Sequence, residues 1–167
     1  MSLQNTPSGE RLHIGFFGLR NAGKSSVVNA VTNQNLSVVS DVLGTTTDPV
    51  KKAMELLPLG PVVIIDTPGL DDLGELGQMR VKRAKEMLSI TDIAVVVIDA
   101  QKRESEEDTA LLNIIKEKKI PFIIAYNKAD LVDKPDTKEN EVYVSAKTGE
   151  NIETLNSNVD VILMAIA

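Results

Sequence analysis

Apolar residues gather in five short runs along this 167-residue chain, separated by stretches in which apolar positions recur at helical spacing. The runs are rich in β-branched residues and cover Leu12 to Phe17, Val62 to Asp66, Ile93 to Asp99, Phe122 to Asn127 and Val142 to Ser145. Continuous apolar runs of this length are typical of strands buried on both faces. Between the runs, apolar positions three and four residues apart predict helices over Gln78 to Ile90 and Ser105 to Lys119.

This alternation of strands and helices predicts an α/β fold, with a mostly parallel sheet and helices on both faces. One connection differs, because Val50 to Leu57 leads through Pro58, Gly60 and Pro61 into the next apolar run. Proline and glycine set turn geometry and are not expected to continue either strand, so this segment predicts an antiparallel hairpin at one edge. The expected architecture is a three-layer fold around a six-stranded sheet.

The domain organisation is simple. No internal repeat or low-complexity tract interrupts the pattern, so we expect a single domain over residues 1 to 167. The one linker-like stretch, Val132 to Glu141, is expected to be a polar loop between the last two strands. The helix-like stretch Val159 to Ala167 carries no Gly, Asn or Pro stop signal, which suggests that further domains follow in a longer protein.

Composition and charge exclude several classes of function. The chain has no cysteine, which excludes a disulfide scaffold, a thiolate zinc site, a cysteine-ligated cluster and a thiol nucleophile within it. A net charge of −6 and an aromatic content of 3% disfavour general binding to nucleic acid. No apolar run approaches the roughly 20 residues of a membrane span, and the N-terminus has no signal-peptide pattern. We therefore expect a cytoplasmic protein with no membrane partner.

A phosphate-binding motif follows the first predicted strand. The segment from Gly18 to Ser25 reads GLRNAGKS, which matches GxxxxGK[ST] and precedes a helical pattern over Ser26 to Asn33. Glycines let backbone N–H groups surround a phosphate, Lys24 reaches the outer phosphates, and the Ser25 hydroxyl ligates Mg²⁺. The residues expected to bind nucleotide here are Gly18, Asn21, Ala22, Gly23, Lys24, Ser25 and Ser26.

Motifs after later strands indicate which nucleotide is bound. Asp66 begins the sequence DTPG, in which its carboxylate can hold Mg²⁺ through water and the Gly69 N–H can sense a γ-phosphate. Taken alone, such a sequence is also common as a strand-ending turn. Asp130 ends the sequence NKAD, and its carboxylate can accept hydrogen bonds from N1 and N2 of guanine, which adenine does not offer. These features predict GTP rather than ATP, with base contacts from Asn127, Lys128, Asp130, Ser145, Ala146 and Lys147.

The order of these motifs resembles the TrmE-Era group of P-loop GTPases over essentially the whole chain. The resemblance implies a small-GTPase-like P-loop NTPase fold, Mg²⁺-dependent hydrolysis of GTP to GDP and phosphate, and GTP-dependent pairing of G domains. Val39 to Asp48 resembles the switch I segment of the group. This similarity places Thr45 and Thr46 at the nucleotide, with Thr46 as an Mg²⁺ ligand in the GTP state.

The same resemblance suggests how hydrolysis proceeds. Asn21 matches the asparagine that binds K⁺ in potassium-activated members, together with switch I backbone carbonyls, which here would be those of Ser40 and Val42. Many GTPases place Gln directly after the DxxG motif, whereas this chain has Leu70, so slow intrinsic turnover is expected. Glu75 is the first candidate to orient the attacking water among the polar residues that follow, which also include Asp71, Asp72 and Gln78, and the alternative is a solvated acidic loop. The expected catalytic residues are Lys24, Asn21, Thr46, Gly69 and Glu75.

Longer segments narrow the resemblance. Thr6 to Ala30, Gly44 to Gly69 and Asp71 to Gly77 are similar to the N-terminal GTPase domain of the HydF family, which acts in FeFe-hydrogenase H-cluster maturation. This implies a GTP-driven switch, with companion domains for dimerisation and for an iron–sulfur cluster beyond residue 167. Two other functions stay open: an RNA- or ribosome-associated assembly GTPase, and an interaction module that binds nucleotide with negligible turnover.

Overall fold

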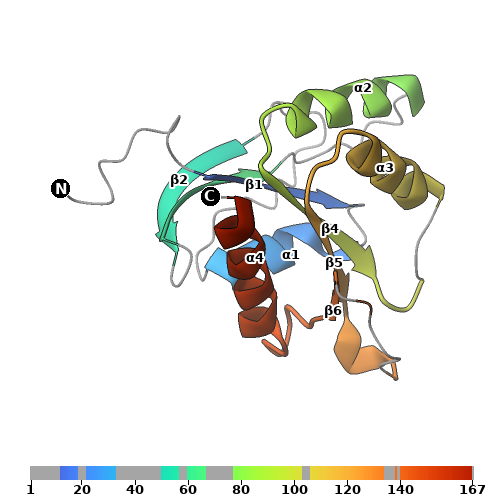
Figure 1. Ribbon diagram of the computed structural model, residues 1–167. Coiled ribbons are helices and arrows are strands. Elements are labelled where there is room, and N and C mark those ends of the chain that lie inside the picture. The colour runs from blue at the N-terminus through green and yellow to red at the C-terminus, as the bar shows by residue number, and fades with distance from the viewer. Residues whose placement is uncertain are drawn as a thin grey trace.

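One sheet of six strands runs through the centre of the molecule (Figure 1). The computed structural model describes residues 12–18, 22–32, 50–56, 60–66, 77–102, 106–133, 138 and 140–166. The strands lie in the order β2-β3-β1-β4-β5-β6, and among the described pairs only β2 and β3 run antiparallel. This confirms the expected parallel sheet with an edge hairpin. The strands are β1 (Leu12–Gly18), β2 (Val50–Leu56), β3 (Gly60–Asp66), β4 (Ile93–Asp99), β5 (Phe122–Asn127) and β6 (Glu141–Tyr143).

Helices cover both faces of the sheet. They are α1 (Lys24–Thr32), α2 (Gly77–Leu88), α3 (Glu106–Glu117) and α4 (Ile152–Ile166). Alternate residues of each strand point to opposite faces, so Val95 and Val97 pack with α1 and α4, whereas Val96 packs with α2 and α3. Figure 1 shows the two helix layers on either side of the strands. Every residue of β4 is buried because both layers cover it, which explains its unbroken apolar sequence.

Several element boundaries differ by one or a few residues from those expected, and α2 and α3 are each slightly shorter than their apolar patterns. The first helix begins at Lys24 rather than Ser26, inside the phosphate-binding motif. The last helix begins at Ile152, well before the apolar stretch at Val159, because its first turns bury Ile152 and Leu155 while exposing polar residues between them. Strand β6 ends at Tyr143; the Val144 N–H still donates to the Tyr126 carbonyl of β5 at 2.8 Å, and from Ser145 onward the backbone bonds within its own loop, with the Ser145 N–H donating to the Glu150 carbonyl at 3.0 Å.

The edge hairpin corrects one further expectation. Gly60 and Pro61 were expected to lie in the turn, but both belong to β3, where they pair with Leu56 and Glu55 of β2. Proline is tolerated at this position because pairing between β3 and β1 starts only at Val62, so the missing N–H leaves no gap in that pairing.

The parallel strands bring their carboxyl ends to one edge of the sheet. Gly18, Asp66, Asp99 and Asn127 are the last residues of β1, β3, β4 and β5, respectively. In open α/β sheets, ligands bind outside these ends, so this edge is where a site is expected.

No helix in the described ranges is long and apolar enough to cross a membrane.

Candidate functional site

The phosphate-binding motif connects β1 to α1, as its sequence context predicts. Gly18 has a φ of +144°, and a side chain there would run into the carbonyl oxygen of Val97. Gly23 has a φ of +83°, and a Cβ atom at this position would lie 2.5 Å from Asn127 Nδ2. Both positions therefore require glycine. The first helical hydrogen bond of α1 runs from the Val27 N–H to the Gly23 carbonyl at 3.0 Å, and the N–H groups at the start of a helix are the ones that bind anions at such sites.

Lys24 and Asp66 form a buried ion pair at this edge. Lys24 Nζ lies 3.0 Å from Asp66 Oδ1, and the two side chains are only 5% and 6% exposed. The two residues come from the start of α1 and the end of β3, which adjoins β1 in the sheet. Two charges removed from water in this way require a partner of opposite charge, and each residue supplies it to the other.

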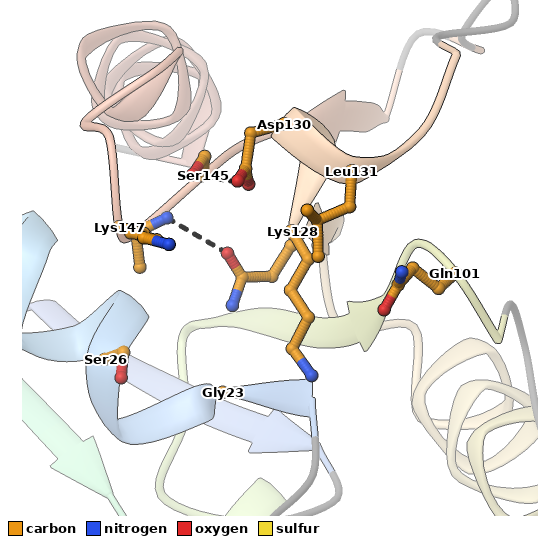
Figure 2. A pocket seen from close by; sticks show the side chains of 10 residues that line it. Gly23, Ser26, Gln101, Lys128, Asp130, Leu131, Ser145 and Lys147 are labelled. Carbon is orange, nitrogen blue, oxygen red and sulfur yellow. Dashed lines mark hydrogen bonds between the residues drawn. The ribbon is translucent and has the colours of Figure 1, made fainter.

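A cavity of about 520 Å³ opens beside the phosphate-binding loop (Figure 2). Its lining comes from α1, from the loop after β5, from the loop after β6 and from the turn after β4. Asp130 is exposed, and its Oδ1 accepts a hydrogen bond from Ser145 Oγ at 2.9 Å. This contact fixes the orientation of the carboxylate at the cavity. The lining residues are Gly23, Ser26, Gln101, Asn127, Lys128, Asp130, Leu131, Ser145, Ala146 and Lys147.

The Asn127 side chain bridges two loops at the carboxyl ends of the strands. Its Nδ2 donates a hydrogen bond to the Ala22 carbonyl at 2.9 Å, and its Oδ1 accepts one from the Ala146 N–H at 3.1 Å. The side chain is buried, and its bond to the Ala22 carbonyl lies away from water, whereas its bond from the Ala146 N–H is partly buried. Asn127 therefore connects the phosphate-binding loop to the loop after β6 and holds the cavity in shape.

Asn127→Ala should lower the free energy of unfolding by about 2–3 kcal/mol, because it leaves the Ala22 carbonyl and the Ala146 N–H without this buried partner. Urea denaturation measures the change. Asn113→Ala, at an exposed position of α3, is the matched control and should shift stability by less than about 0.5 kcal/mol. Similar values for the two variants would show that the Asn127 bridge does not stabilise the fold.

Sequence reasoning missed three residues at this site. Gln101 and Leu131 line the cavity, and Leu131 is 57% exposed there. Asp99 binds Lys128, with 3.0 Å between Asp99 Oδ2 and Lys128 Nζ. No motif marks these residues. The sequence did carry one clue to Asp99, because Asp99 ends a predicted strand just as Asp66 and Asn127 do, and so lies at the same edge of the sheet.

The expected site residues divide into two groups. The structure brings the phosphate-binding loop, Lys24, Asp66 and the two base-binding loops to one edge, with Ser25 in the first turn of α1. The other group lies outside the described residues, and consists of Asn21, Ser40, Val42, Thr45, Thr46, Gly69 and Glu75.

The described donors fit Mg²⁺. The Ser25 hydroxyl and the Asp66 carboxylate supply hard oxygen atoms, which are the ligands that Mg²⁺ prefers, and Asp66 lies beside the loop that would hold phosphate. In the described ranges, no three His, Cys, Asp or Glu side chains gather into a metal-binding cluster. Mg²⁺ does not need one here, because at nucleotide sites it is usually held by one or two protein oxygens, phosphate and water.

Comparison with known proteins agrees with this geometry. The chain is 34% identical to GTPase Der of Mycoplasmopsis agalactiae over 173 residues, covering 90% of this chain and 38% of Der. It is 37% identical to the tRNA modification GTPase MnmE of Legionella pneumophila over 153 residues, covering 87% of this chain and 33% of MnmE. The chain thus spans about a third of the length of these relatives.

Among solved structures, Era in complex with MgGDPNP and a segment of 16S ribosomal RNA is 25% identical, with a TM-score of 0.70. The match covers 88% of this chain and 55% of Era. Residues 13–128 match the family described as 50S ribosome-binding GTPase. GTPases of this kind use Mg²⁺ with GTP and GDP. The chain therefore belongs to the 50S ribosome-binding GTPase family, as a P-loop G domain related to TrmE, Der and Era.

Proposed function

We propose that the edge formed by the ends of β1, β3 and β5 binds Mg²⁺ and GTP, with phosphate and base held in adjacent compartments. The observation that carries this proposal is the Asn127 bridge, which fixes the cavity containing Asp130 directly beside the phosphate-binding loop. Asp130 then accepts hydrogen bonds from guanine N1 and N2, while the Ala146 loop faces guanine O6. Lys128 and Lys147 line the same cavity.

On the phosphate side, nucleotide binding exchanges the partners of the Lys24–Asp66 pair. The Lys24 ammonium would turn to the β- and γ-phosphates, while Ser25, and Asp66 through a water, would hold Mg²⁺, which would neutralise charge on the phosphates. Because the two charged side chains are already buried as a pair, GTP binding does not have to remove them from water. Lys24 thereby stabilises the charge that develops as the bond to the γ-phosphate breaks.

We further propose that Thr46 and Gly69 contact the γ-phosphate when GTP is bound. These contacts would be lost after hydrolysis, which would make the domain a switch. Asn21, with the backbone carbonyls of Ser40 and Val42, would hold a K⁺ that supplies positive charge to the phosphates. Thr45 would lie at the nucleotide, and Glu75 would orient water. Similarity to the TrmE-Era group supports the roles of switch I and Asn21, whereas the support for Glu75 is its place in the polar stretch just after the DTPG sequence.

Phosphate release from GTP should be several-fold faster in K⁺ than in Na⁺ at equal ionic strength, and should be near background with ATP. Asn21→Ala should remove the difference between the two salts, whereas Asn113→Ala, exposed on α3, should keep it. Equal wild-type rates in K⁺ and Na⁺ would contradict the K⁺ site. Comparable rates with GTP and ATP would contradict the assignment of the base cavity.

For the longer protein we propose a role in FeFe-hydrogenase H-cluster maturation, with GTP hydrolysis controlling companion domains for dimerisation and cluster binding. The support is sequence similarity of Thr6 to Ala30, Gly44 to Gly69 and Asp71 to Gly77 to the HydF family. The test is maturation of apo-hydrogenase by the full-length protein, in which Lys24→Met should abolish the GTP-dependent part of the activity. GTP-independent maturation, or none, would contradict this role.

A second candidate is work on RNA or the ribosome, favoured by similarity to the tRNA modification GTPase MnmE and to Era solved with ribosomal RNA. Co-sedimentation of the full-length protein with ribosomal subunits in GTP, but not in GDP, would support it. Nucleotide binding without measurable turnover would instead support a nucleotide-dependent interaction module.

A further inference from the structure

Lys128 presents two different chemical surfaces to its surroundings. It lines the cavity, yet its ammonium lies 3.0 Å from the Asp99 carboxylate, and Asp99 is not among the described residues that line the cavity. The charged end of the side chain is thus paired with a carboxylate that does not itself line the cavity. Figure 2 shows the Lys128 side chain extended, with the four-carbon stem beside the cavity. The stem is therefore the part of Lys128 that faces a bound molecule.

The Asp99 carboxylate is itself held in place. Its side chain is only 6% exposed, and Asp99 Oδ1 accepts a hydrogen bond from the Gln101 N–H at 2.9 Å, while Oδ2 binds Lys128. Asp99 also lies directly beside Asn127 in the pairing of β4 with β5, and the Ala100 N–H donates to the Asn127 carbonyl at 2.8 Å. With both oxygens engaged and the backbone paired, the carboxylate is a fixed point.

The backbone of Lys128 matches this arrangement. Lys128 has a φ of 67° and a ψ of 34°, the left-handed conformation that L residues rarely adopt. This conformation ends β5 and sends the chain into the short 3-10 helix Ala129–Leu131, which carries Asp130. The direction of the Lys128 stem thus depends on the turn at its own backbone and on Asp99 at its far end.

We propose that Asp99 is a positioning residue for nucleotide binding, which holds the Lys128 ammonium so that the Lys128 stem packs against the flat face of the purine. This inference rests on the proposed function of the cavity and adds a residue outside it. Methylene groups against a ring face bury apolar surface without distinguishing one purine from another. Asp99 should therefore affect how tightly purines bind, while Asp130 determines which purine is preferred.

The test measures binding of GDP and IDP with Mg²⁺ by isothermal titration calorimetry, using wild type, Asp99→Asn, Lys128→Met and the double variant. Asp99→Asn and Lys128→Met should each weaken GDP binding about tenfold, and the double variant should bind within about twofold of Lys128→Met. IDP lacks the 2-amino group but has a similar ring face, so Asp99→Asn should leave the ratio of GDP to IDP affinity unchanged. Asp160→Asn, on α4, is the control and should bind as wild type does.

Lys128→Arg is a second test, in which the buried Asp99 carboxylate keeps a cation as its partner. It retains the cation and an aliphatic stem, so it should bind GDP within about threefold of wild type. Binding by Lys128→Arg as weak as that of Lys128→Met, additive losses in the double variant, or an altered GDP to IDP ratio in Asp99→Asn would each overturn the role of Asp99. Wild type that binds neither nucleotide would overturn the proposed function of the cavity itself.

Discussion

Replacing Lys24 with methionine should slow GTP hydrolysis by roughly 100- to 1,000-fold at saturating GTP, the usual loss when one preorganised charge stabiliser is removed. Lys24 starts α1 and is buried at the edge where phosphate is proposed to bind. Methionine keeps most of the side-chain volume but has no charge and no donor. Single-turnover phosphate release is the measurement, with Lys118→Met, in the exposed turn after α3, as the control. A loss of less than about tenfold would contradict the role of Lys24.

The same substitution should also destabilise the nucleotide-free protein, because the buried Asp66 carboxylate loses its ion pair. Breaking a buried pair from one side typically costs about 3–5 kcal/mol. Adding Asp66→Asn to Lys24→Met should restore part of that stability without restoring hydrolysis, which separates the structural role of the pair from its catalytic one. Urea denaturation and phosphate release on the same samples provide both values. Recovery of hydrolysis in the double variant would contradict this separation.

Asp130→Asn should change the base preference of the cavity from guanine to xanthine, with GTP affinity falling roughly 100- to 10,000-fold. The loss corresponds to two hydrogen bonds between a carboxylate and guanine N1 and N2. Asp130 Oδ1 already accepts from Ser145 Oγ at 2.9 Å, so the asparagine oxygen should take that contact and turn its NH₂ group toward the base. Xanthine carries an oxygen where guanine carries its 2-amino group, and it can accept from this NH₂ group.

Competition between GTP and XTP for the wild-type and variant domains measures the change. Asp133→Asn, exposed in the loop just after Asp130, removes the same charge without touching the cavity lining, and should leave the preference for GTP intact. Equal weakening of both nucleotides by Asp130→Asn would indicate a general electrostatic effect instead of direct contact with the base.

Most of the fold could be predicted from the sequence because burial on both faces leaves a clear apolar signature. Strands β4 and β5 have the expected bounds, since each lies between two other strands and under helices on both sides. The errors occur where that signature is weak. The start of α4 escaped prediction because its exposed positions are polar, and Pro61 was placed in a turn because a sequence does not show where pairing with a neighbouring strand begins.

The candidate site was predictable from the sequence where one short segment carries its residues, and not where two segments share a contact. The phosphate-binding loop and the Asn127 to Asp130 segment are each continuous motifs, and the structure places them at one edge. The ion pairs of Lys24 with Asp66 and of Lys128 with Asp99 depend on which strands are neighbours in the sheet. Leu131 lines the cavity only because the 3-10 helix turns it there.

The Asn127 bridge also constrains how the domain is made in the cell. The Asn127 side chain binds a carbonyl that lies 105 residues earlier in the chain. At about 5–20 residues per second, synthesis separates the appearance of these two groups by on the order of ten seconds. During that interval the phosphate-binding segment has been synthesised, but the loops after β5 and β6 that line the cavity have not. Until Asn127 has been made, the cavity proposed to hold the base cannot form, so we expect nucleotide to stabilise the domain only after most of the sheet has been synthesised.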